Sequence, residues 1–327
     1  MHRRTVLSAM AAAGATTAAP WAAAQSSSAW PDRNLSWVVP YPAGGGTDVL
    51  ARTVAEAMRV TLGQQIVVEN RPGAATNIGA QSVATAKPDG YTFMSADNAV
   101  LAFNEHLFSK LPFSPEKDFT YVGGISRFPL ALVVHPAFEV KTVKEFLAYA
   151  RANPGKLNYA SPGNGSPHHL AMEMFKNRAQ IFATHIPYRG AAPALQDVMG
   201  GQVPCMFLDL AAGLPVIQSG KVRALAIGSA KRVAALPDVP TLAEAGVPNT
   251  EVYAFQGILA PAGLPAAITA RLNGDLNKAL ANPAVAKRMA DFGMEALPGT
   301  PEQFRAMARA ESKRWGEIIK AAGVKLD

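Results

Sequence analysis

Cysteine is almost absent from this sequence: Cys205 is the only one among 327 residues. A single thiol excludes an intramolecular disulfide. The neighbours of Cys205 are apolar, which predicts a buried, chemically inert thiol. Charged residues are also few, at 17% of the chain, but aliphatic and aromatic residues are spread along its whole length, as in a globular protein.

Several nucleotide-binding and hydrolase motifs are missing as well. No G-x-x-x-x-G-K-[ST] run occurs, and Gly44-Gly45-Gly46 lacks G-x-G-x-x-G spacing, which excludes P-loop and Rossmann phosphate sites. No G-x-S-x-G elbow occurs, which argues against a secreted hydrolase. The formal net charge is +7, but the basic residues are scattered, so no nucleic-acid partner is expected. A modest positive field favours small anions as ligands.

The first 24 residues have the pattern of a secretory signal peptide. Arg3 and Arg4 form a basic start, Val6 to Ala19 is a small apolar core, and Ala22-Ala23-Ala24 supplies an A-x-A cleavage site. The paired arginines leave both the Sec and the twin-arginine export routes open. No later run reaches the roughly 18 apolar residues of a membrane-spanning helix. The sequence therefore predicts export into a bacterial periplasm, with cleavage near Ala24.

One stretch combines a strand, a glycine-rich loop and the start of a helix. Leu35 to Val39 is an apolar strand, Pro40 to Asp48 is the loop, and Val49 to Leu62 is an amphipathic helix. Glycine lets backbone N–H groups approach a ligand, and the helix dipole directs partial positive charge toward it. The stretch is either half of an anion site or a plain strand-to-helix turn.

The same unit occurs a second time. Leu157 to Ala160 is a short strand, Ser161 to Ser166 is a glycine-containing loop, and a helix follows over Pro167 to Asn177. Ser166 followed by Pro167 is favourable chemistry for a helix N-terminus. Two such loops, each at the end of its own strand, favour the anion-site interpretation over the plain turn.

The order of strands and helices predicts an α/β fold in two parts. Strands alternate with helices through Ser95, which indicates a parallel sheet covered on both faces, with ligands beyond the carboxyl ends of its strands. That rhythm changes at two strands, Tyr121 to Ile125 and Leu130 to Val134, which suggests a crossover into a second domain. The apolar run Tyr253 to Leu259 could cross back. The expected lobes are residues 25–127 with 253–327, and residues 128–252.

These residues together resemble a known family. Val38-Val39-Pro40-Tyr41-Pro42-Ala43-Gly44-Gly45-Gly46-Thr47-Asp48 is similar to its first-loop signature, and Tyr159 to Ala171 to its second. Glu69 to Ala74, Pro88 to Thr92, His185 to Gly190 and Gly200 to Val203 supply further landmarks in the right order. The chain resembles the solute-binding proteins of tripartite tricarboxylate transporters, the Bordetella uptake gene (Bug) family.

The resemblance implies a type II periplasmic binding-protein fold, in which two α/β lobes joined by crossover strands close on a ligand. It implies a monomeric, non-enzymatic receptor without a cofactor or metal, which captures a small organic carboxylate for membrane transporter subunits. The two glycine loops would grip the carboxylate, largely through backbone N–H groups and ordered water. The residues that the resemblance assigns to the ligand site are Tyr41, Ala43, Gly44, Gly45, Thr47, Asp48, Ser161, Gly163, Asn164, Gly165, Ser166, Tyr188, Arg189, Gly190 and Asp209.

Several of these residues have a second interpretation. Asp48 could cap its helix instead of orienting a ligand water, and Ser161 and Ser166 could also be helix caps. Arg189 could bind a carboxylate bidentately or be a solvated surface side chain. The adjacent histidines 168 and 169 lack metal-ligand spacing, and His169 is more often a residue that braces a loop.

The sequence also leaves alternative functions open. An orphan receptor that signals to a membrane kinase would have the same binding site, and a secreted hydrolase is the further alternative. The sequence does not choose between a di- or tricarboxylate, an aromatic acid and an amino acid. In relatives, the position of Asp209 faces the distal end of the ligand only in some cases.

Overall fold

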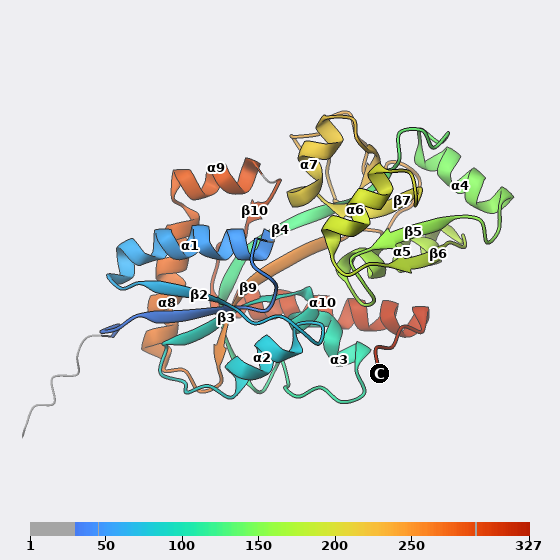
Figure 1. The fold of residues 1–327 in the computed structure, drawn as a ribbon. Helices are drawn as coiled ribbons and strands as arrows, with labels where there is room; N and C mark the ends of the chain where they lie inside the picture. The colour runs from blue at the N-terminus through green and yellow to red at the C-terminus, as the bar shows by residue number, and fades with distance from the viewer. Residues whose placement is uncertain (1–29, 45, 292) are drawn as a thin grey trace, which may run out of the picture.

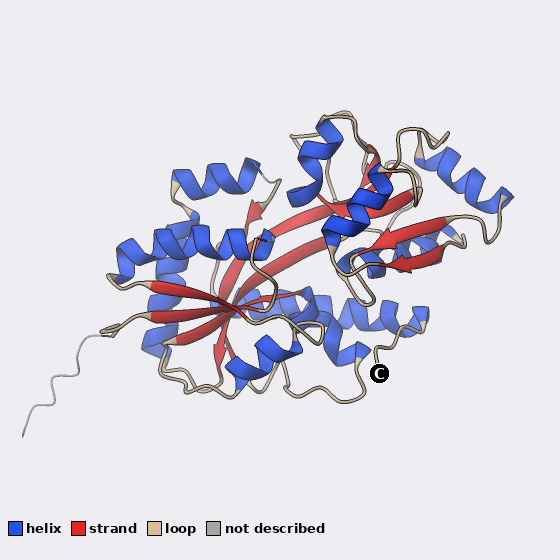
Figure 2. Cartoon of the chain, viewed as in Figure 1, coloured by secondary structure: helices blue, strands red, loops and turns tan. Residues whose placement is uncertain are grey.

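A computed structural model of the chain describes residues 30–44, 46–291 and 293–327 (Figure 1). The expected signal peptide and Gly45 lie outside the described residues. Strands form a curved band through the molecule, and helices cover it on both sides (Figure 2). The elements, in chain order, are β1 (Leu35–Val39), α1 (Gly46–Leu62), β2 (Ile66–Asn70), α2 (Asn77–Ala84), β3 (Thr92–Asp97), the π-helix η1 (Ala99–Phe103), α3 (Asn104–Leu107), β4 (Phe119–Val134), α4 (Val143–Ala152), β5 (Asn158–Ser161), α5 (Pro167–Ala179), β6 (Thr184–Pro187), α6 (Ala191–Met199), β7 (Cys205–Asp209), α7 (Leu210–Gln218), β8 (Arg223–Ile227), β9 (Tyr253–Pro261), α8 (Ala266–Leu280), α9 (Pro283–Asp291), β10 (Glu295–Ala296) and α10 (Pro301–Ala322).

The first part of the sheet follows the predicted βα rhythm. β1 pairs in parallel with β2 on one side and β3 on the other, and β9 then pairs antiparallel with β3. Parallel neighbours need a crossover, and α1 and α2 supply the two crossovers here. The carboxyl ends of β1 and β3 therefore meet at one edge, where the first glycine loop leaves β1.

β4 is one continuous strand where the sequence predicted two. It runs over Phe119–Val134, and its first half pairs antiparallel with β9 as far as Pro129 opposite Tyr253. Its second half, from Leu130 onward, pairs antiparallel with β7 and β8. The expected break over residues 126–129 is absent because β9 pairs with this segment residue by residue, although the pairing carries two register shifts.

The second part of the sheet repeats the arrangement of the first. β5 pairs in parallel with both β6 and β7, so the second glycine loop leaves the carboxyl end of β5. The same edge holds the carboxyl ends of β6 and β7, where residues 188–190 and Asp209 lie. The loops expected to act together are therefore at the ends of neighbouring strands.

Apolar layers on the two faces of the sheet form the core. Trp37, Phe93 and Ile258 lie in a buried cluster with α1, α8 and α9, and Met94 and Leu259 lie in the cluster on the opposite face. α10 belongs to this second cluster and runs beneath both parts of the molecule (Figure 1). Its Trp315 is fully buried and packs edge-on against Phe103, with ring centroids 5.1 Å apart.

We propose lobe boundaries close to those expected from the sequence. β4 changes its pairing partners between Pro129 and Leu130, and β9 begins at Tyr253. These two positions lie beside the expected ends of the second lobe, residues 128–252. Within the described residues, no helix is long and apolar enough to cross a membrane.

Candidate functional site

The first loop is closed by Asp48, in the first turn of α1. This carboxylate is buried and accepts the Gly44 N–H at 2.9 Å, the Asn70 amide at 2.9 Å and the Arg52 guanidinium at 2.9 Å. Burial alone would raise the pKa of Asp48, but the hydrogen bonds from Arg52, Gly44 and Asn70 outweigh it and lower the pKa. Asp48 is thus an ionised group that ties the loop to the first turn of its helix.

Tyr41, in the same loop, is bound to the end of β3. Its hydroxyl donates to Asp97 Oδ2, and both side chains keep part of their surface accessible. Burial and the nearby Asp97 carboxylate raise the pKa of Tyr41, and burial also raises the pKa of Asp97 against its hydrogen bonds. Asp97 was not among the predicted site residues.

The second loop is closed by His169, in the first turn of α5. The Gly165 N–H donates to His169 Nδ1 at 3.0 Å, and the Ser166 hydroxyl accepts the His169 N–H as the helix N-cap. Both glycine loops are therefore closed in the same way, because Gly44 also donates to the side chain four residues ahead. The expectation that His169 braces its loop is confirmed.

The side-chain rings of Tyr159, His185 and His169 form a stack next to the second loop. His169 and His185 are nearly parallel with centroids 4.0 Å apart, and Tyr159 stacks on His185 at 4.9 Å. Burial lowers the pKa of each histidine to about 4, so both rings are neutral near pH 7. His185 was not among the predicted site residues, and it reaches the stack because β6 pairs with β5 and sets His185 opposite Tyr159.

Ser161 contacts a ring of that stack. Its hydroxyl is fully buried, lies 2.6 Å from His185 Nε2 and accepts the Gly163 N–H at 3.1 Å. A serine next to a histidine can be a nucleophile, but an activated serine needs an accessible hydroxyl. This one is enclosed by the loop, which it holds in shape.

The segment 188–190 is attached to the second loop. The Tyr188 N–H donates to Ser161 O at 2.9 Å, and the Gly190 N–H donates to Pro162 O at 3.1 Å. The Tyr188 hydroxyl donates to Asp197 on α6, and burial, with that carboxylate, raises the pKa of Tyr188 to about 12. The two loops of the second lobe therefore form one unit.

Both carboxylate oxygens of Asp209 contact other residues of the fold. It caps α7 by accepting the Ala212 N–H at 2.8 Å, and its second oxygen lies 3.1 Å from His168 Nε2. Burial opposes ionisation, but the contact with His168 and the Ala212 N–H bring the pKa of Asp209 below its usual value. These contacts explain Asp209 without a ligand.

Four predicted residues make no hydrogen bond beyond regular helix bonding and no ion pair with any residue that the structure describes: Ala43, Thr47, Asn164 and Arg189. Asn164 and Arg189 are exposed. The N–H groups of Gly44, Gly163 and Gly165, by contrast, are already bonded within their loops. The groups free to meet a ligand are thus Thr47 and the N-terminal turn of α1 on one side, and Asn164 and Arg189 on the other.

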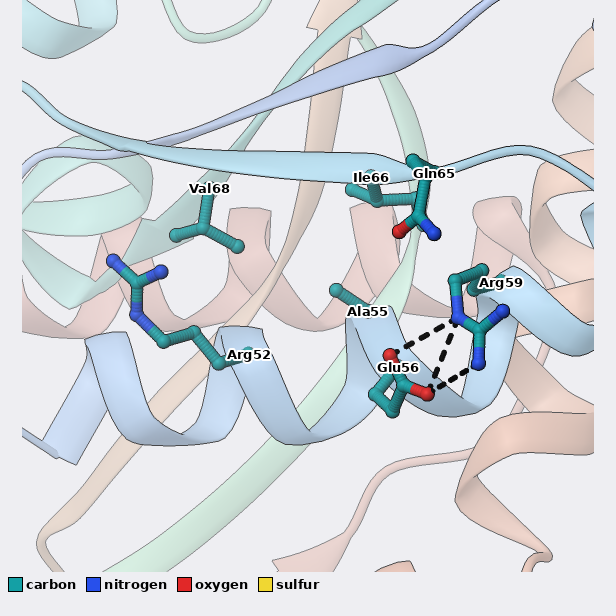
Figure 3. Close-up of a pocket in the computed structure, with 7 residues that line it drawn as sticks. All are labelled: Arg52, Ala55, Glu56, Arg59, Gln65, Ile66 and Val68. Carbon is teal, nitrogen blue, oxygen red and sulfur yellow. Dashed lines mark hydrogen bonds and ion pairs between the residues drawn. The ribbon is translucent and has the colours of Figure 1, made fainter.

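The elements that carry these two sets of groups face each other across the two parts of the molecule. Figure 1 shows the N-terminal end of α1 directed toward the loops that precede α5 and α6. Two surface pockets lie elsewhere. One of about 200 Å³ lies between α1 and β2 (Figure 3), and its Arg59 is paired with Glu56. The other, of about 560 Å³, lies between α5 and α10.

The described residues of these loops belong to no metal site. Over residues 30–44, 46–291 and 293–327, no group of three or more His, Cys, Asp and Glu side chains could hold a metal ion. Cys205 is buried, its thiol donates to Asn158 O at 3.3 Å, and burial raises its pKa well above the usual value. The predicted inert thiol is confirmed.

The model of the tripartite tricarboxylate transporter family receptor matches residues 50–324 of this chain. The chain belongs to this family. It is 36% identical to BugT of Bordetella pertussis over 306 residues, which are 93% of this chain and 94% of BugT. The family resemblance inferred from the loop motifs is confirmed.

Solved structures of family members confirm the fold. The periplasmic binding protein BugD superposes with a TM-score of 0.82 at 36% identity, covering 90% of this receptor and 99% of BugD. Rpa4515 of R. palustris, solved with adipate, superposes with a TM-score of 0.85 at 36% identity, covering 90% of this chain and 99% of Rpa4515. MatC of Rhodopseudomonas palustris, solved with bound malate, superposes with a TM-score of 0.79 at 35% identity, covering 88% of this chain and 99% of MatC. The receptor has the two-lobe fold of periplasmic binding proteins.

Proposed function

We propose that this receptor binds a small organic carboxylate between its two glycine loops in the periplasm and delivers it to the membrane subunits of a tripartite tricarboxylate-type transporter. The observation that supports the site most strongly is the pair of loops closed by Asp48 and His169. Each loop is held rigid by its own helix. A site built in advance binds more tightly, because little conformational entropy is lost when the ligand arrives.

The free groups are suited to a carboxylate. The first N–H groups of α1 have no acceptor within the helix and carry the positive end of its dipole. Arg189 adds an exposed guanidinium with no partner among the described residues. Adipate and malate, the ligands of the two structural relatives, are both carboxylates. Closure of the lobes would shield these contacts from water and strengthen them.

A thermal-shift screen tests this function. Carboxylates of two to eight carbons, a neutral sugar and a nucleotide are compared, and we expect only carboxylates to raise Tm, through preferential binding to the folded state. Arg189→Met should reduce the shift. Arg178→Met is the matched control, because Arg178 is also exposed and unpaired among the described residues but lies in the α5–α10 groove. A shift with the sugar or nucleotide alone would refute the proposal.

A further inference from the structure

Asp97 is an acidic side chain beside a site for an anion. It ends β3, and its Oδ2 accepts the hydroxyl of Tyr41, which belongs to the first glycine loop. Its Oδ1 accepts the Ala99 N–H at 3.2 Å, and no cation pairs with it among the residues that the structure describes. Part of its surface remains accessible. A bare solute carboxylate next to Asp97 would therefore meet a like charge with no cation to offset it.

A second hydrogen-bond acceptor, Gln256, lies beside Asp97 in a row of three side chains that crosses strands β3, β9 and β4. Gln256 on β9 is the register partner of Asp97 on β3 and of Ser126 on β4, so all three side chains share one face of the sheet. Gln256 is 3% exposed, and its Oε1 has no hydrogen-bond partner within the described chain. Its amide nitrogen makes only a long contact of 3.4 Å to Ser126 Oγ.

An orphaned amide oxygen is expensive to keep buried, because it loses its hydrogen bonds to water and gains none in the fold. Gln256 lies near the start of β9, where the chain returns from the second lobe to the first. Gln256 Oε1 is kept at this cost beside Asp97, a carboxylate without a cation partner among the described residues. This arrangement indicates that another molecule supplies a hydrogen-bond donor.

We propose that the solute carries a donor group, an ammonium or a hydroxyl, next to the carboxylate that the glycine loops hold, and that Asp97 accepts from this donor with Gln256 behind it. The solute class is then an amino acid or a hydroxy acid, not an unsubstituted dicarboxylate. An ammonium group also neutralises the Asp97 charge, so amino acids should gain more than hydroxy acids. This inference rests on the proposed function.

The raised pKa of Asp97, caused by burial, agrees with this arrangement. A carboxylate that lacks a cationic partner in the free protein is harder to ionise, and an arriving ammonium supplies that partner. Tyr41 keeps the carboxyl group in place through its hydroxyl, and the Ala99 N–H holds the other oxygen. Asp97 is therefore positioned before the ligand binds.

Isothermal titration calorimetry on the full-length mature protein tests the inference. The ligands are matched sets with one carbon skeleton each: succinate, malate and aspartate; glutarate, 2-hydroxyglutarate and glutamate; adipate and 2-aminoadipate. In the set that binds most tightly, we expect the donor-bearing acids to bind at least tenfold more tightly than the unsubstituted acid. Equal affinities across every set would overturn the inference and leave the carboxylate function intact.

Two variants test whether Asp97 and Gln256 cause the preference for donor-bearing acids. Asp97→Asn keeps an acceptor for Tyr41 but removes the charge, and it should reduce the preference for the amino acid at least tenfold. Gln256→Leu should reduce the preference without lowering Tm, because it also removes the orphaned oxygen. Asp238→Asn is the matched control, since Asp238 is exposed on the second lobe. A preference unchanged in both Asp97→Asn and Gln256→Leu would overturn the assignment. If no carboxylate binds the wild type, the proposed function itself fails, and this inference fails with it.

Discussion

Asp48 and His169 perform the same task with different chemistry. Each accepts the N–H of a glycine four residues earlier, one with a carboxylate and the other with a neutral imidazole nitrogen. The carboxylate also binds Arg52 and Asn70, so it stays ionised although it is buried. The imidazole can accept only while it is neutral, and its burial in the ring stack keeps it so.

Removing the Asp48 carboxylate should destabilise the fold. Asp48→Ala leaves the Gly44 N–H without an acceptor and leaves the Asn70 amide with only Tyr41 O. We expect a loss of about 2 kcal/mol in the free energy of unfolding, measured by urea denaturation. Asp291→Ala is the control. It breaks the Lys287–Asp291 ion pair, which has the same four-residue spacing as Asp48–Arg52 but is exposed. The change should cost less than about 0.5 kcal/mol. Equal losses would contradict the bracing role.

The ring stack gives stability a defined pH dependence. Folding lowers the pKa of His169 and of His185 to about 4, whereas an unfolded histidine has a pKa near about 6.5. Between these values the unfolded state binds more protons, so the free energy of unfolding falls as the pH falls, by up to about 1.4 kcal/mol per pH unit for each ring.

Urea denaturation at several pH values from 7 to 4 measures this slope. The double variant His169→Gln, His185→Gln should be less stable at pH 7 but show a flatter profile. Asp48 and Asp209 affect a lower range, because their folded pKa values lie below their ordinary ones and their contributions disappear only as they protonate. A double variant with the wild-type slope would show that other groups cause it.

At the scale of elements, the sequence predicted the strand–loop–helix units because each carries local signals. Ser166 is the N-cap and Pro167 the first residue of α5, as the sequence indicated. α7 had no such signal. It is apolar on all sides and contains Gly213 and Pro215, so it shows neither a 3.6-residue pattern nor good helix propensity. Asp209, its N-cap, was instead assigned to the ligand by resemblance.

Long-range pairing decided the elements that the sequence missed. β4 passes through Pro129, a residue that normally interrupts a strand, because β9 pairs with it from a position more than 120 residues later in the chain. Asp97 and His185 were missed for the same reason, since only tertiary pairing brings them to the loops.

α10 should contribute strongly to stability, because it packs beneath both parts of the molecule. Its Trp315 is fully buried against Phe103. We expect Trp315→Ala to lower the free energy of unfolding by about 4 kcal/mol, and Trp315→Phe by less, because the phenyl ring fills part of the space. Val60→Ala on α1, where Val60 is 74% exposed, should cost less than about 0.5 kcal/mol. Urea denaturation of the three variants checks the order.

At the scale of the whole molecule, the second loop also touches the first lobe. A Cβ atom added to Gly165 would lie 2.8 Å from Leu107 Cδ1 and 2.9 Å from Leu326 Cδ1, near the carboxyl terminus. The Leu326 N–H donates to Leu107 O at 3.0 Å, so the end of the chain is fixed to the first lobe where that lobe meets the loop. A ligand held by both loops would add to this contact between the lobes.

The structure of the complex with the carboxylate that binds most tightly tests the central claim directly. We predict that the carboxylate oxygens lie within hydrogen-bond distance of the N-terminal turn of α1, around Thr47, and of the loop that contains Asn164. A carboxylate that contacts only one lobe, or that occupies the groove between α5 and α10, would contradict the proposal that the two glycine loops hold the ligand together.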